Sequence, residues 1–176
     1  MLRSIWVLFL CGVLCAGCAW GEQPSWGETG KAVTFQVTCS GTLDPGLVYR
    51  IAIDTDGNVL TGPSDDPDDW KNMYILEWRN GVASLLSPDG KRTYLLESSF
   101  SGRVFEARVD LEALGHPEQM EVMVVVEDEE GNVVDSLQNF LTVRLRYQQS
   151  VSRSDEGGDA LDPSGDILRV NVEVSL

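Results

Sequence analysis

The stretch MYILEWRNGVASLL, residues 73–86, decides the fold class of this chain. Two runs rich in apolar, aromatic and β-branched residues flank the dipeptide Asn80-Gly81. Both residues of a two-residue type I′ turn need positive φ, which asparagine and glycine tolerate, so the pattern predicts a tight β-hairpin. Alternation along the first run places its large apolar side chains on one face, which we expect to meet the core: Tyr74, Leu76 and Trp78.

The same two-residue period recurs along most of the chain after residue 31. Apolar side chains alternate with polar ones in the segments AVTFQVTC (32–39), GRVFEARVDL (102–111) and ILRVNVEV (167–174). Patterns typical of long helices are absent, and about nine short strands separated by turn signals are typical of an antiparallel sandwich. The sequence therefore predicts an all-β fold, a single antiparallel β-sandwich (immunoglobulin-like or jelly-roll-like) over residues 32–176. A closed barrel is the alternative.

The N-terminal segment MLRSIWVLFLCGVLCAGC (1–18) has the layout of an export signal. Arg3 precedes a short apolar core, and the small residues Ala16-Gly17 precede Cys18, which predicts a signal peptide over residues 1–17. The end of the segment, LCAGC, resembles the lipobox of bacterial lipoproteins, although it has Cys15 where that family usually has leucine.

This resemblance implies a lipid on Cys18, cleavage just before it, and a tether over residues 18–31. The domain would then be anchored to a bacterial membrane and face the periplasm or the cell exterior. The alternative is an ordinary signal peptide with an incidental cysteine.

Charge and composition exclude several classes of function. The formal net charge of −15 disfavours nucleic acid as a partner, because an acidic surface repels the phosphate backbone. His116 is the sole histidine, and the sequence has no nucleophile elbow, phosphate loop or dinucleotide fingerprint. We therefore expect a protein that is not an enzyme. Cys39 lies in phase with apolar neighbours and is expected to be a small buried hydrophobe.

Acidic residues after residue 53 form a candidate metal site. Asp54, Asp56 and Asn58 stand at alternate positions where a strand is expected to end, and Asp65 follows in an acidic segment. Hard oxygen ligands at this spacing suit calcium. The alternative is a turn in which these side chains cap their own backbone. The pattern does not fit an EF-hand, because Gly57 is fourth in the loop instead of sixth.

Residues 49–78 and 105–137 carry a second resemblance. A strand ends in Asp54 and Asp56, Thr-Gly-Pro follows at 61–63, and an aromatic residue opens the next strand. A Leu-Gly corner comes later at 114–115. This order resembles the β-sandwich group of family 9 carbohydrate-binding modules and their DOMON-type relatives, which implies a sandwich that binds carbohydrate or a related envelope polymer.

A sugar-binding module needs an exposed aromatic ring with polar groups around it. Trp70 lies in DDPDDWKN outside the strand alternation and is the candidate platform, with Asp68, Asp69 and Asn72 as hydrogen-bonding neighbours. The alternative is that Trp70 anchors its loop. Two functions follow: a non-catalytic recognition module for carbohydrate or an envelope polymer, or a structural or assembly lipoprotein that binds another protein. An exposed strand edge or apolar patch would favour the second.

Overall fold

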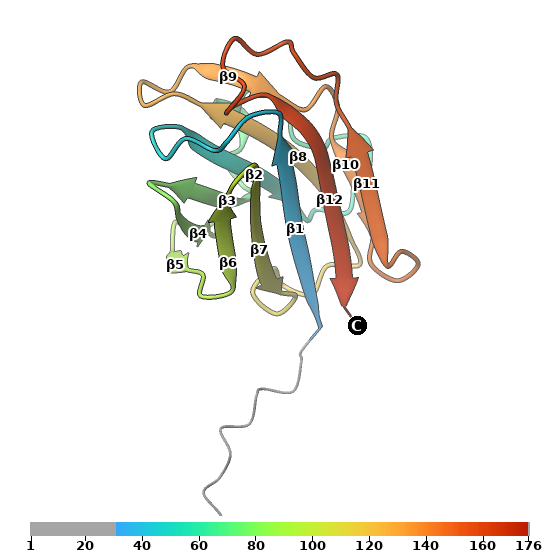
Figure 1. The fold of residues 1–176 in the computed structure, drawn as a ribbon. Helices are drawn as coiled ribbons and strands as arrows, with labels where there is room; N and C mark the ends of the chain where they lie inside the picture. The colour runs from blue at the N-terminus through green and yellow to red at the C-terminus, as the bar shows by residue number, and fades with distance from the viewer. Residues whose placement is uncertain (1–30, 176) are drawn as a thin grey trace, which may run out of the picture.

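The computed structural model describes residues 31–175 and gives them twelve β-strands and one short 3-10 helix. The strands form two antiparallel sheets packed face to face, so the predicted β-sandwich is confirmed and the closed barrel is wrong (Figure 1). The predicted signal peptide and all of the tether before Lys31 lie outside the described residues. Within the described part of the chain, no helix is long and apolar enough to cross a membrane.

The two sheets differ in the number and order of their strands. The five-stranded sheet runs β11 (Ser150–Ser154), β12 (Ile167–Ser175), β1 (Ala32–Cys39), β7 (Val104–Asp110) and β6 (Ser98–Ser101). The seven-stranded sheet runs β10 (Leu141–Arg144), β8 (Gln119–Glu127), β2 (Val48–Asp54), β3 (Tyr74–Arg79), β4 (Val82–Leu86) and β5 (Arg92–Tyr94), and β9 (Val133–Ser136) pairs with β8. The short strands β6, β9 and β11 bring the number above the nine or so expected from alternation.

The predicted hairpin is confirmed. Asn80 and Gly81 have φ angles of 52° and 73°, as a type I′ turn requires. The turn joins β3 to β4 and sets Trp78 opposite Ala83. Leu76 and Trp78 are fully buried, as the alternation predicts, whereas Tyr74 is half-buried.

The core fills the space between the sheets. Its aromatic centre joins three buried rings, with Tyr49 and Phe105 4.9 Å apart and Phe105 and Trp78 4.8 Å apart between centroids. Cys39 lies in the same core, fully buried, which confirms the prediction of a small buried hydrophobe. Burial, together with the charges of Asp135 and Asp166, raises the pKa of the Cys39 thiol to about 12, so the thiol is protonated and inert at physiological pH.

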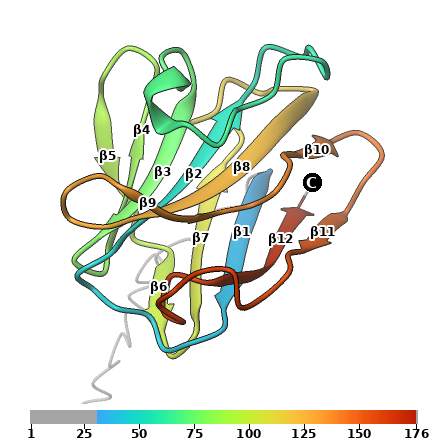
Figure 2. The same cartoon turned by 90° about the horizontal axis from the view of Figure 1, so that it is seen from above.

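The part of the seven-stranded sheet formed by β2 and β8 is buried on both faces. Ala52, Met123 and Val125 point away from the other sheet and are still no more than 3% exposed. The segment 55–73, with the 3-10 helix η1 (Pro67–Asp69), lies on this outer side (Figure 2). Within residues 31–175, no such segment covers the outer face of the five-stranded sheet (Figures 1 and 2).

Candidate functional site

Trp70 is buried, so the predicted aromatic platform is wrong. The ring is 3% exposed and belongs to the apolar core. Its indole nitrogen donates a hydrogen bond to the carbonyl oxygen of Ser64, 2.9 Å away. Trp70 thus anchors the loop that covers the sheet. The proposed polar neighbours Asp68, Asp69 and Asn72 are exposed, but the ring that they were expected to surround is buried.

The predicted calcium loop has the geometry of a capped turn. Asp54 Oδ1 accepts from the Asp56 N–H, Asp56 Oδ1 from the Asn58 N–H, and Asn58 Oδ1 from the Leu60 N–H. Each side chain therefore closes a turn two residues ahead, as short polar side chains do in loops. Asp65 is exposed, and the structure does not gather it with Asp54 and Asp56 into a metal-binding group among the described residues.

A different set of carboxylates does converge. One oxygen each from Asp135, Asp159 and Asp166 lies within 4.8 Å of the other two. Such hard oxygen atoms suit calcium, but calcium takes roughly six to eight of them. Two of these three carboxylates already accept hydrogen bonds from backbone N–H groups. Asp135 accepts the N–H of Ile167 at 2.6 Å, and Asp166 accepts the N–H of Gly158 at 2.9 Å.

We therefore assign this cluster to fastening the 155–166 loop against the sandwich. Burial, together with the charges of Asp159 and Asp155, raises the pKa of Asp135 to about 6, against the opposing effect of its backbone hydrogen bonds.

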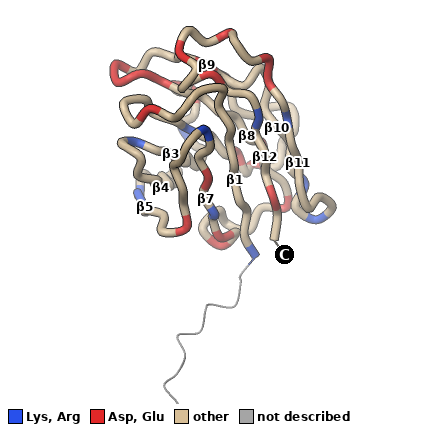
Figure 3. The backbone as a smooth tube through the Cα atoms, in the orientation of Figure 1, with Lys and Arg blue, Asp and Glu red and all other residues tan. Residues whose placement is uncertain are grey.

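Arginines gather on strands β2, β3 and β5 of the seven-stranded sheet, away from the carboxylate cluster beside β9. Acidic residues follow the loops near β9, while basic residues occur beside β3 and β5 (Figure 3). Glu77 lies at the centre of the arginines, with Arg50 at 3.1 Å and Arg92 at 2.7 Å. Burial opposes ionisation of Glu77, but the Arg92 hydrogen bond and the arginine charges outweigh it and hold its pKa below the usual range. Arg79 is a looser neighbour, 3.8 Å from Glu77 and half exposed.

Strand β5 is the open edge of this sheet. Its three residues are all exposed, and among the strands that the structure describes β4 is its one partner. The residues that flank β5 form hydrogen bonds with β4 and with the residue after it. The Leu95 N–H donates to the Ala83 carbonyl oxygen at 3.1 Å, and the Ser87 N–H donates to the Lys91 carbonyl oxygen at 2.9 Å. In an antiparallel strand, the main-chain N–H and C=O groups of successive residues point alternately to the two edges of the strand. The main-chain N–H and C=O groups of Arg92 and Tyr94 therefore point away from the sheet.

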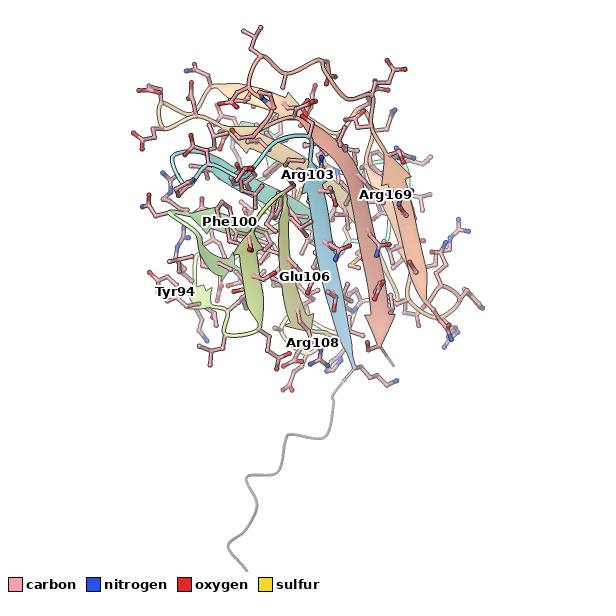
Figure 4. The ribbon with its side chains drawn as sticks, in the orientation of Figure 1. Tyr94, Phe100, Arg103, Glu106, Arg108 and Arg169 are labelled. Carbon is pink, nitrogen blue, oxygen red and sulfur yellow. The ribbon has the colours of Figure 1, made fainter. Side chains whose placement is uncertain are left out.

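A hollow lies on each side of this edge. The inner groove, about 400 Å³, opens between the two sheets, and its apolar lining consists of Leu85, Leu95, Leu96, Val109 and Ala113. The outer pocket, about 380 Å³, lies on the outer face and is lined by Glu77, Arg79, Asn80, Val82, Ser84, Arg92 and Tyr94. Tyr94 lines both hollows and is 67% exposed. Figure 4 shows it at the rim of the molecule.

The sequence contains a signal for this surface. In KRTYLLES (91–98), Leu95 and Leu96 are adjacent, and an extended chain sends adjacent side chains to opposite sides. One leucine must then leave the core, and Leu96 is 97% exposed. Alternation identifies the core face of a strand, and it gives no weight to an adjacent pair such as Leu95 and Leu96.

No protein-family model matches this chain, and neither a curated protein nor a solved structure does.

Proposed function

We propose that the protein is an exported, non-catalytic binding module that receives an extended segment of another protein at the β5 edge. The observation that carries the proposal is the outward-facing main chain of Arg92 and Tyr94, with a hollow on each side. An extended peptide can add to such an edge through main-chain hydrogen bonds, while its alternate side chains occupy neighbouring pockets.

The β5 edge is short and follows the exposed Lys91, but within the strand itself the usual protection by charge is weak. Natural edges are often guarded by charged side chains that make pairing with another strand costly. Arg92 is the charge within β5, but its guanidinium turns back to Glu77 and to the hydroxyl of Ser84, 2.6 Å away. Tyr94 and Leu96 add exposed apolar surface beside the edge. Exposed apolar surface next to the unpaired edge of a strand supports a protein partner.

The proposed setting is the bacterial cell envelope. Support comes from the N-terminal segment, whose apolar core and LCAGC end are typical of a lipoprotein signal with its lipid on Cys18. The acidic surface supports a partner other than nucleic acid. A lipid anchor would hold the module near the membrane, with β5 free to meet envelope proteins.

A proline substitution at the edge tests the function. Tyr94→Pro removes an N–H that β4 does not use, so the fold should survive while pairing with an added strand is blocked. Binders would be selected from a displayed library of random peptides against the full chain in detergent. We expect the selected peptides to lose binding to Tyr94→Pro and to keep it with Leu161→Pro, at a fully exposed loop residue elsewhere. Selected peptides that bind Tyr94→Pro as well as the unmodified chain would refute the proposal.

A second candidate function is carbohydrate binding, which the ring of Tyr94 favours. An exposed aromatic face beside Arg79, Asn80 and Ser84 has the composition of a sugar site. A polysaccharide screen with the full chain tests this function. Tyr94→Ala should abolish binding, whereas Tyr147→Ala, which removes a ring that is 79% exposed elsewhere, should not. A screen without any binding polysaccharide would remove this candidate.

A further inference from the structure

We infer that the segment received at β5 alternates apolar and acidic side chains. The inference rests on the proposed function and names the chemistry of its partner. It follows from the two hollows, which lie on opposite faces of one edge strand and differ in polarity.

The geometry of β5 fixes the alternation. Thr93 pairs with Leu85 and lines the inner groove, whereas Arg92 and Tyr94 line the outer pocket. A strand added beside β5 continues the same pleat, so its successive side chains also point alternately inward and outward. Every second residue of the partner therefore meets the inner groove, and the residues between them meet the outer pocket.

The inner groove selects an apolar side chain. Leu85 is buried at 4% exposure, and Val109, 2% exposed, lies across the groove on β7. The charged side chains at the rim include Glu97 and Arg108, which pair with each other at 3.1 Å. Lys91, Thr93 and Asp110 also line the groove, but in its apolar part a polar group would be separated from water among leucine, valine and alanine side chains.

The outer pocket selects an acidic side chain. Two arginines, Arg79 and Arg92, line it together with one carboxylate, that of Glu77. Arg50, on the neighbouring strand β2, pairs with Glu77 at 3.1 Å and with Glu127 at 2.7 Å. Three arginines therefore face two carboxylates in this group, which leaves one positive charge in excess. The net charge of the chain opposes an acidic ligand at long range, but screening over about 8 Å leaves the local arginines dominant at contact.

Three synthetic peptides test the inference on the full chain in detergent, by fluorescence anisotropy. The first alternates valine with glutamate, the second alternates valine with lysine, and the third has the composition of the first with its glutamates grouped together. We expect the first peptide to bind about tenfold more tightly than each of the others, which corresponds to replacing attraction by repulsion at a partly exposed charge pair.

Charge reversal supplies the matched variants. Arg79→Glu should move the preference from the glutamate peptide to the lysine peptide, because Arg79 is half exposed and its nearest carboxylate is 3.8 Å away. Arg146→Glu, at an arginine that is 70% exposed far from β5, should leave the preference unchanged.

The outcomes separate the two proposals. Equal affinity for all three peptides, lost in Tyr94→Pro, would overturn the alternation and leave the edge function standing. Absence of binding by all three, while library peptides still bind at the edge, would overturn the alternation as well. Affinities that Tyr94→Pro does not change would overturn the edge function itself.

Discussion

The indole N–H of Trp70 and the carbonyl oxygen of Ser64 are 2.9 Å apart, and this hydrogen bond closes the loop over the seven-stranded sheet. The same loop is held at a second point, where a Cβ on Gly62 would lie 2.8 Å from the ring of Phe140. The two contacts fix the segment that buries the outer face of β2 and β8. The loop is thus part of the core, and its aromatic residue is structural.

Trp70→Ala should therefore lower the stability of the domain. We expect a loss of about 3–5 kcal/mol in the free energy of unfolding, as for removal of a large buried ring. Urea denaturation measures this loss, and Tyr147→Ala, at an exposed ring, is the matched control with a change within about 0.5 kcal/mol. A Trp70→Ala protein as stable as the control would contradict the anchoring role.

Asp135 should make stability fall with rising pH. Its pKa is raised from 3.8 to about 6, so the folded state holds the proton more tightly than the unfolded state. The contribution is complete below about pH 4 and is lost as pH rises through about 6, with a size of up to about 3 kcal/mol. Urea midpoints from pH 4 to 7.5 measure it as the difference between the unmodified chain and Asp135→Asn. A difference that is constant with pH would contradict this prediction.

Glu77 should contribute in the opposite sense. Its pKa is lowered in the fold, so its stabilisation is present above the ordinary pKa of 4.5 and disappears as pH falls through the lowered value. At pH 7, Glu77→Ala should cost about 2 kcal/mol, less than a fully buried ion pair because its arginines are partly exposed. Arg79→Ala, which removes the 3.8 Å contact, is the control and should cost little. Equal losses in the two variants would argue against a central role for Glu77.

Cys18→Ser should abolish lipidation. The sulfur of the Cys18 thiol is the atom that would carry the lipid. Serine keeps nearly the size of the side chain but lacks the thiol. Labelled palmitate fed to cells that express the chain should enter the unmodified protein and not Cys18→Ser. Incorporation into both proteins would refute the lipoprotein hypothesis.

Local sequence signals predicted part of the fold. The Asn80-Gly81 turn depends on two adjacent residues with positive φ, so it could be read without the rest of the chain. Alternation likewise identified β1 and β12, whose inner residues face the core. Strands β6, β9 and β11 have four or five residues and exist through pairing with longer neighbours, so alternation alone does not define them.

The candidate sites depend on contacts between distant segments. Trp70 stands in an acidic, proline-containing segment that is typical of an exposed loop, and its burial follows from how the loop lies across the sheet. Asp135 and Asp166 meet although they are separated by 31 positions in the chain, and MYILEWRNGVASLL gave no sign of the exposed edge beyond β4. Contacts between segments that are distant along the chain cannot be read from the alternation of residues in the sequence.

The pairing of β1 with β12 governs when the protein can fold. Val33 lies opposite Val174, so the middle strand of the five-stranded sheet waits for the last strand to be synthesised. Contacts this distant along the chain slow folding, because a large loop must close first. A chain still emerging from the ribosome therefore lacks its complete sandwich. If the chain is exported as proposed, this delay would keep it unfolded during passage through a secretion channel, and folding would finish only after β12 has crossed.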